Sequence, residues 1–257
     1  MKKIIVPVSG GKDSQACLKM ACNQYGSDNV LGMFCDTQFE HPLTYQHITT
    51  ISELYNVEII RLCDGSVHDK ILKYSRFPGG GARFCTDELK IRAGKNYYKQ
   101  YAIDNDCHIG NSFEVWYGVR SDESAERTKR YIGKVSDEVY PPHEFMSKYP
   151  KYLYRKYGIM FRLPIIDWSY SDVMEYLNGE ENPLYQQGFD RVGCFPCLAS
   201  GDKWKEKAFQ HDDFGKSQYE TIIKLEDIIG KSIWTSKGGK QRNSRDDEGS
   251  GCSICSI

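Results

Sequence analysis

The chain lacks any long hydrophobic run and has almost no net charge. Its 257 residues include 34 basic and 35 acidic side chains, which gives a formal charge of −1 at pH 7. This balance excludes an overall field that attracts nucleic acid or an anionic membrane, although local basic patches remain open. No apolar stretch reaches the roughly 18 residues needed to span a bilayer. Met1-Lys2-Lys3 leads into an apolar run instead of a secretory leader, so we expect a cytosolic protein.

Also missing is the Walker A spacing, which places four residues between a first glycine and a Gly-Lys-Ser/Thr triplet. The chain has instead Ser-Gly-Gly-Lys-Asp-Ser at residues 9–14, directly after the apolar run 4–8. The run predicts a strand, and the residues that follow Asp13 predict a helix. The two glycines permit a tight turn with exposed N–H groups, and the helix N-terminus and Lys12 add positive charge. The pattern therefore predicts a phosphate cradle, with a ligand-free turn as the simpler alternative.

Strand-like and helical runs alternate along the chain, and no internal repeat is visible. The expected strands are 4–8, 30–35, 57–62, 115–119 and 160–164, and the expected helices are 13–25, 42–55, 87–105 and 172–177. This alternation predicts an α/β fold, a doubly wound, Rossmann-like parallel sheet of about five strands with helices on both faces. Ligands of such sheets bind at the carboxyl ends of the strands.

We expect two parts, a nucleotide-binding α/β domain over 1–178 and a C-terminal segment over 179–257. The second part contains a Cys-x-x-Cys sequence and one strongly patterned element at 219–229. The stretch 237–251 is polar and glycine-rich, which predicts a mobile tail. That tail ends with two cysteines, Cys252 and Cys255.

Ten cysteines in a reducing compartment indicate metal binding or redox chemistry more often than disulfides. Five lie in apolar helix or strand patterns and are expected to be small buried hydrophobes: Cys17, Cys22, Cys35, Cys63 and Cys107. Five lie beside glycine, proline or charged residues: Cys85, Cys194, Cys197, Cys252 and Cys255. We take the second group as the candidates for chemistry.

Two further positions fit a nucleotide site. Asp36 ends the second expected strand, where a carboxylate can accept hydrogen bonds from ribose or help to organise a metal ion and phosphate. Gly118 and Arg120 lie at the end of the fourth expected strand, where glycine allows close approach and arginine can bind phosphate through two hydrogen bonds. Helix capping by Asp36 and a solvated charge run after Arg120 are the structural alternatives.

These motifs, in this order, resemble the phosphoadenosine phosphosulfate reductase family of the PP-loop ATP pyrophosphatases. The resemblance covers residues 3 to about 200 and includes the hexapeptide, Asp36-Thr37 with Glu40 and Pro42, Gly118-x-Arg120-x-x-Glu123-Ser124, Trp168-Ser169, and the run from Asn182-Pro183 to Cys194-x-x-Cys197. The motif pattern is most similar to the sulfur-transfer subunit of DNA phosphorothioation systems, through Cys85-Thr86 followed by Leu89-Lys90, and to the small subunit of bacterial ATP sulfurylase.

The resemblance implies that ATP is bound with Mg2+ and cleaved to AMP and pyrophosphate. The implied nucleotide-binding residues are Ser9, Gly10, Gly11, Lys12, Asp13, Ser14, Asp36, Gly118 and Arg120, with Lys12 and Asp13 taking part in catalysis. It also implies a 4Fe-4S cluster on Cys85, Cys194 and Cys197. The fourth place belongs to Cys255 or Cys252, or stays open on one iron. Zinc and three free thiols are the alternatives.

The tail cysteines leave the reaction open. Sulfonucleotide reductases carry their nucleophile in a C-terminal Glu-Cys-Gly-Leu-His motif, which this chain lacks. Cys252 and Cys255 can still form an attacking and resolving pair. The complete hexapeptide favours ATP-dependent sulfur transfer over sulfonucleotide reduction to sulfite, and a nucleotide-binding module without turnover is the third reading.

The implied partners are an adenine nucleotide and a sulfur donor protein of the cysteine desulfurase or thioredoxin-like type. Basic and aromatic residues alternate over 148–157, a composition suited to nucleic acid as the sulfur acceptor. The same composition also covers the outer face of an ordinary helix or loop. We expect no membrane partner, and the oligomeric state stays open.

Overall fold

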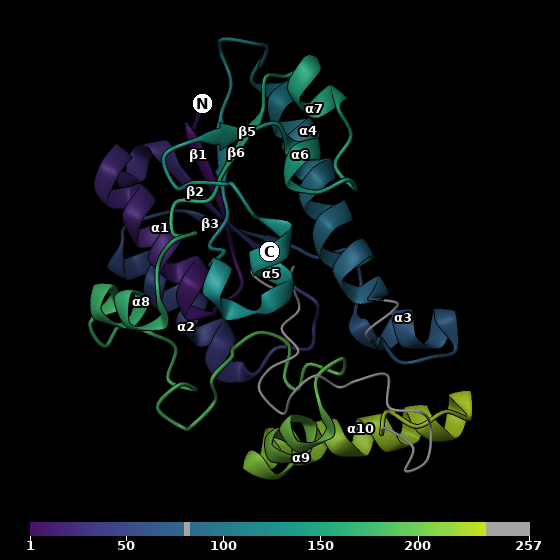
Figure 1. Cartoon of the computed structure of the whole chain (residues 1–257). Helices are drawn as coiled ribbons and strands as arrows, with labels where there is room; N and C mark the ends of the chain where they lie inside the picture. Colours follow the sequence, from purple (N-terminus) through teal and green to yellow (C-terminus); the bar gives the residue numbers. More distant parts are fainter. Residues whose placement is uncertain (80–82, 235–257) are drawn as a thin grey trace.

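A six-stranded sheet forms the centre of the molecule (Figure 1), in a computed structural model that describes residues 1–79 and 83–234. The strands are β1 (Ile4–Val8), β2 (Val30–Cys35), β3 (Ile59–Leu62), β4 (Glu114–Trp116), β5 (Val139–Tyr140) and β6 (Met160–Arg162). Their order is β3-β2-β1-β4-β6-β5, and every pair is parallel except β5 with β6. The predicted α/β doubly wound class is confirmed. The count rises from about five to six because β5 is too short to give a sequence pattern.

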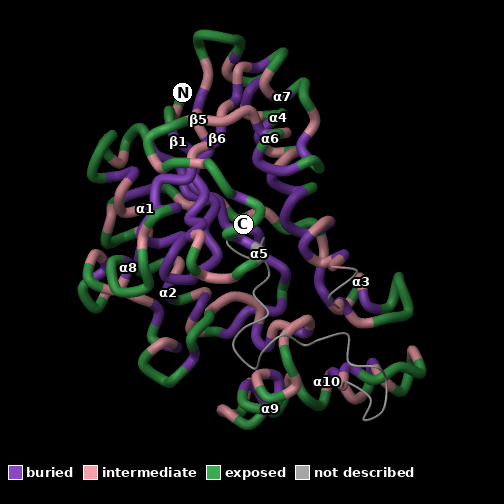
Figure 2. Tube along the Cα trace, in the orientation of Figure 1, coloured by how far each residue is buried: buried purple, intermediate pink, exposed green. Residues whose placement is uncertain are grey.

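Helices cover both faces of the sheet, and two further helices lie beyond the carboxyl ends of its strands (Figure 1). The helices are α1 (Lys12–Tyr25), α2 (Pro42–Leu54), α3 (Val67–Tyr74), α4 (Ala93–Asp104), α5 (Ala125–Arg130), α6 (Pro142–Phe145), α7 (Tyr152–Arg155), α8 (Tyr170–Leu177), α9 (Asp202–His211) and α10 (Asp213–Ile229). Every residue of β1 and β2 is buried, as the inner strands in Figure 2 show. Such burial on both faces is why these strands read as continuous apolar runs.

One predicted helix differs in its first part. The sequence predicts a helix over 87–105, and the structure has a π-helical stretch at η2 (Cys85–Arg92) that continues directly into α4. π-Helical turns are rare and are frequent at functional sites. This one begins at a cysteine that the sequence singles out for chemistry.

Between residue 200 and the end of the described chain at residue 234, two helices lie at the carboxyl-end side of the sheet (Figure 1). α9 and α10 cross closely at Gly215, where a Cβ atom would overlap the carbonyl oxygen of Ala208. Their apolar side chains join one cluster with α3 and with the start of η2: Val67, Ile71, Phe84, Phe209, Ile222 and Leu225. Within the part of the chain that the structure describes, no helix is long and apolar enough to cross a membrane.

Candidate functional site

The predicted phosphate cradle is a tight loop between β1 and α1. Gly10 has φ +77°, and a Cβ atom there would lie 2.5 Å from a methyl carbon of Thr44. The Ser14 hydroxyl accepts a hydrogen bond from the Ser9 N–H at 3.1 Å and donates one to the Gly11 carbonyl at 2.9 Å. The first backbone N–H groups of α1 therefore lie at the carboxyl end of β1, and N–H groups at the start of a helix favour a bound anion.

Lys12 is a buried cation at this helix start. Its side chain is about 5% exposed, and its Nζ lies 3.5 Å from the Asp13 carboxylate. The rings of Tyr170 and Tyr185 lie 4.9 and 5.2 Å from the same nitrogen. Burial lowers the pKa of Lys12, and Asp13 partly opposes that shift. Because burial weakens the hydration of the ammonium, a phosphate oxygen at this place would be a strong additional partner.

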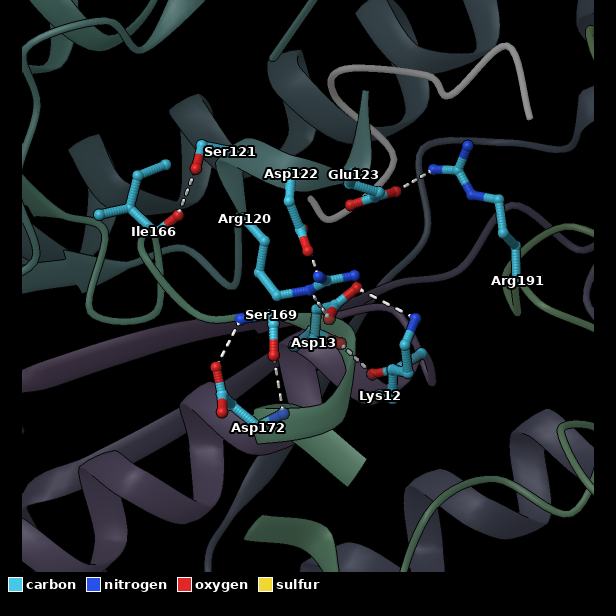
Figure 3. Close-up of polar contacts among 12 residues, drawn as sticks. Lys12, Asp13, Arg120, Ser121, Asp122, Glu123, Ile166, Ser169, Asp172 and Arg191 are labelled. Carbon is cyan, nitrogen blue, oxygen red and sulfur yellow. Dashed lines mark hydrogen bonds and ion pairs between the residues drawn. The ribbon is translucent and has the colours of Figure 1, made fainter. Parts of the chain in front are cut away.

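Arg120 completes a cation pair around Asp13 (Figure 3). Its Nε donates to Asp13 at 2.7 Å, and its guanidinium also pairs with Asp122. Burial opposes the charge, but the two carboxylates raise the pKa of Arg120 above its ordinary value. Gly118 permits this approach, since a Cβ atom there would overlap the backbone of Asp13. The structure thus brings together four predicted residues from two loops, with Asp13 holding both cations.

Asp36 lies at the end of β2, as predicted, and is fully engaged by donors of the chain. It accepts hydrogen bonds from the Gln38 N–H at 2.8 Å, from the Tyr45 hydroxyl at 2.8 Å and from Arg61 Nε at 2.8 Å. Burial alone would raise the pKa of Asp36, but these hydrogen bonds and the Arg61 charge lower it overall. A ribose hydroxyl would have to share this carboxylate with Arg61 or Tyr45.

Three predicted cysteines line one small cavity of about 30 Å³, next to Lys90. Cys85 begins η2, whereas Cys194 and Cys197 belong to the loop before α9. Burial raises the pKa of the Cys194 thiol, and the Lys90 ammonium opposes that rise. Within residues 1–79 and 83–234, no three His, Cys, Asp or Glu side chains converge closely enough to hold an ion. The thiols therefore suit iron or zinc by their chemistry, without an assembled ligand set.

The cysteine cavity adjoins the end of β2. The Thr37 hydroxyl lies 3.3 Å from Cys194 Sγ and donates to Glu40 at 2.6 Å. Glu40 forms an isolated β-bridge with Cys194, and the Phe195 N–H donates to the Phe39 carbonyl at 2.7 Å. Because Thr37 directly follows Asp36, the cavity lies next to the carboxyl end of β2.

Sequence reasoning missed several residues of this region. Lys90 lines the cysteine cavity and is buried, although its place after Cys85 is part of the noted pattern. Asn182 is fully buried and donates to the Gly10 carbonyl at 3.2 Å, and the Tyr185 hydroxyl accepts from the Lys12 N–H at 3.0 Å. Arg191 pairs with Glu123 (Figure 3). The Asn182-Pro183-Leu184-Tyr185 run was a family signal, but nothing in its spacing indicated a contact with residues 170 positions earlier.

The cysteine predictions divide three ways. Cys17, Cys22, Cys35 and Cys107 are buried, as predicted. Cys63 is exposed, so its prediction is wrong: β3 ends at Leu62, and Cys63 lies just beyond the sheet, where Gln38 donates to its sulfur at 3.0 Å. Cys252 and Cys255 lie outside the described residues, as does the predicted tail.

An α/β sheet that opens a glycine-rich phosphate loop at its switch point, with two buried cations beside that loop, defines a nucleotide-binding protein of the PP-loop class. The chain belongs to the phosphoadenosine phosphosulfate reductase domain family, which it matches over residues 3–200.

The individual proteins that match this chain share only part of its sequence and length. An uncharacterised protein of Methanocaldococcus jannaschii is 29% identical over 202 residues, which are 77% of this chain and 36% of that protein. The chain spans between 36% and 66% of the length of the first curated relatives it matches. An adenosine 5'-phosphosulfate reductase of Bacillus pumilus is 32% identical over 66 residues, 24% of this chain and 25% of that protein. The solved phosphoadenylyl-sulfate reductase of Candida auris is 15% identical with a TM-score of 0.49, over 76% of this chain and 83% of that one.

Proposed function

We propose that this protein binds ATP through the 9–14 loop and cleaves it between the α and β phosphates, so that pyrophosphate leaves and AMP is attached to an acceptor. It then supports sulfur transfer to that acceptor, in which the sulfur displaces AMP. The observation that carries the proposal is the adjacency of two features at one end of the sheet. The buried cations Lys12 and Arg120 contact Asp13 at the loop, and Thr37, at the same end of the sheet, contacts Cys194 of the three-thiol cavity. A reaction that needs both a phosphate leaving group and a sulfur nucleophile would use this arrangement.

The residues of the loop would stabilise the leaving pyrophosphate. Lys12 and the first amides of α1 would face the β and γ phosphates, and Arg120 would neutralise charge that develops near the α phosphate. Asp13 would keep both cations in place, since it contacts each of them without ligand. Mg2+, which the family resemblance implies, would bind together with ATP and would neutralise charge on the leaving pyrophosphate.

The cysteines would supply the sulfur side of the reaction. Cys85, Cys194 and Cys197 would hold a 4Fe-4S cluster, or zinc, with Cys255 as the proposed fourth ligand, and Lys90 would offset the negative charge of the thiolates. When bound, such a cluster supplies a site at which inorganic sulfur can be held. In this division of labour, residues 1–178 bind the nucleotide and residues 179–257 bring two of the cavity thiols and the Cys252 and Cys255 pair.

We propose the sulfur acceptor and the sulfur donor only as classes of molecule. Nucleic acid is the proposed acceptor, and a cysteine desulfurase or a thioredoxin-like protein is the proposed sulfur donor. The 148–157 segment divides in the structure: Tyr149, Leu153 and Tyr157 are buried in the core, and Lys151, Arg155 and Lys156 are exposed. Three basic side chains of this segment are therefore available to nucleic acid phosphates, and part of the aromatic signal of the segment is core packing.

A second reaction is supported by one comparison. The match to the Bacillus pumilus adenosine 5'-phosphosulfate reductase favours a sulfonucleotide as substrate, reduced to sulfite by a thiol. That match covers 24% of this chain, whereas the loop that suits a triphosphate is complete. We therefore place ATP first.

One experiment separates the two reactions. Anaerobically purified protein is given either ATP with Mg2+ or a sulfonucleotide with a dithiol, in each case with and without a mixed tRNA and DNA pool. Pyrophosphate and AMP from ATP support the proposed function, and sulfite from the sulfonucleotide with inert ATP replaces it by the reductase. The Lys216→Ala variant, which changes an exposed lysine of α10, is the control and is expected to match the wild type.

A further inference from the structure

The chain from Asn182 to Val192, called here the cover segment, lies directly on the phosphate loop. Its first residue donates to the Gly10 carbonyl at 3.2 Å. A Cβ atom built on Gly11 would lie 3.1 Å from the Val192 carbonyl oxygen and 3.3 Å from the Tyr185 hydroxyl. Both ends of the segment thus contact the loop, and Gly11 has no side chain because the cover segment occupies that space.

The Tyr185 hydroxyl accepts a hydrogen bond from a backbone N–H that a bound phosphate would also use. The donor is the Lys12 N–H at 3.0 Å, and the Tyr185 ring lies 5.2 Å from Lys12 Nζ. That N–H belongs to the first residue of α1, where the N–H groups of a helix start have no partner within the helix. Burial raises the pKa of Tyr185, so the hydroxyl stays neutral near pH 7. An ionised phosphate oxygen is a stronger acceptor than a neutral phenol for the same N–H.

We propose that Tyr185 occupies the phosphate position of the ligand-free loop, and that a phosphate-bearing ligand displaces its hydroxyl from the Lys12 amide and loosens the cover segment. The inference rests on phosphate binding by the 9–14 loop, the first step of the proposed function. In this proposal the Tyr185 hydroxyl competes with phosphate for the Lys12 N–H and does not take part in the chemical reaction.

The cover segment connects the loop to the cysteine cavity. After Tyr185 it reaches Arg191, which pairs with Glu123 (Figure 3). Three residues later Cys194 pairs with Glu40 and lines the cavity. Release at Tyr185 therefore loosens the chain immediately before two of the three thiols. By thermodynamic reciprocity, whatever fills the cavity and moves this segment also changes the affinity for phosphate.

The test measures binding of inorganic pyrophosphate by calorimetry. Tyr185→Phe keeps the ring over Lys12 and removes the competing oxygen, so we expect about fivefold tighter binding than in the wild type, the effect of one neutral hydrogen bond. Tyr219→Phe makes the same change on α10, where the ring packs against Phe209, and is expected to bind as the wild type does. Equal or weaker binding by Tyr185→Phe overturns the proposal.

Hydrogen exchange gives a second readout. Pyrophosphate is expected to accelerate exchange of the backbone amides of 184–193 in the wild type, and Tyr185→Phe is expected to show that faster exchange without ligand. Unchanged or slower exchange in the saturated wild type overturns the proposal even if the affinity shift is found. A wild type that does not bind pyrophosphate at all sinks the proposed function itself, which separates the two failures.

Discussion

Lys12 is the side chain that we expect to contribute most to phosphate binding. It is buried between two tyrosine rings, and its partner Asp13 is shared with Arg120. Lys12→Met keeps most of the side-chain volume and removes the charge. We expect at least a hundredfold loss of pyrophosphate release from ATP, because a charge-assisted contact in a buried site is lost.

The measurement for Lys12→Met is a steady-state pyrophosphate assay, with circular dichroism as a check that the fold persists. Release within threefold of the wild-type rate would remove Lys12 from the phosphate site.

Cys194 tests the thiol cavity. It contacts Thr37, lines the cavity with Cys85 and Cys197, and is partly buried. We expect Cys194→Ser to lose most of the iron or zinc of anaerobically purified protein, because a serine hydroxyl is a poor ligand for either metal. Cys63→Ser, on an exposed cysteine, is the matched control and should keep its metal. Full metal content in Cys194→Ser, measured by plasma emission, contradicts the ligand assignment.

At the scale of elements, a buried polar network fixes α2 and the chain after α8 to α1. His47 Nε2 donates to the Gln15 side-chain oxygen at 2.8 Å, and Gln15 donates to the Tyr55 hydroxyl and to the Glu180 carbonyl. Burial lowers the pKa of His47 to about 4, from an ordinary 6.5. The unfolded chain therefore binds more protons than the folded chain between these two pH values.

The free energy of unfolding should fall as the pH drops from about 6.5 to about 4, by an amount on the order of 3 kcal/mol from His47. Above pH 6.5 this contribution is fully present. Urea unfolding at pH 7 and pH 5 measures the part of this fall that lies above pH 5, about 2 kcal/mol. His47→Gln should lose stability at pH 7 and show a smaller pH dependence, whereas His68→Gln, on a half-exposed side chain, should keep the wild-type dependence. An unaltered pH dependence in His47→Gln would show that another group causes it.

The crossing of α9 and α10 depends on a second glycine contact. A Cβ atom at Gly215 would overlap the carbonyl oxygen of Ala208, whereas one at Gly201 would meet open space. We expect Gly215→Ala to lower the free energy of unfolding by about 1–3 kcal/mol, since the two helices would have to move apart. Gly201→Ala should stay within about 0.5 kcal/mol of the wild type, as surface changes do. Equal urea midpoints for the two variants would show that the helices do not approach this closely.

At the scale of the whole molecule, a phosphate ligand should stabilise the fold by mass action. At a pyrophosphate concentration of one hundred times its Kd, the free energy of unfolding should rise by about 2.7 kcal/mol. Chemical denaturation with and without pyrophosphate measures this rise. Lys12→Met should show no rise at the same concentration. A rise that survives in Lys12→Met would place the anion site elsewhere.

The sequence was sufficient for the sheet and for the meeting of the loop with Gly118 and Arg120, because parallel strands bring their carboxyl ends to one edge. It was insufficient where contacts depend on long-range packing. β5 has only two residues, and α3 was missed although Ser66 and Asp69 form a capping box at its start. The prediction that Cys63 is buried was wrong because the apolar strand before it ends at Leu62. The contact of Tyr185 with Lys12 joins positions 173 residues apart, and no local pattern encodes it.

The family match ends at residue 200, but the apolar cluster that contacts two of the cavity thiols extends beyond that residue. Phe209, Ile222 and Leu225 on α9 and α10 belong to the apolar cluster against which Cys85 and Cys194 pack. The matched domain thus contains all three cavity sulfurs and the residues that line the cavity, whereas the apolar cluster that contacts Cys85 and Cys194 is completed by a later stretch of chain. A variant that ends at residue 200 would leave the remaining side chains of this cluster, among them Phe39 and Leu89, exposed on the side that α9 and α10 cover.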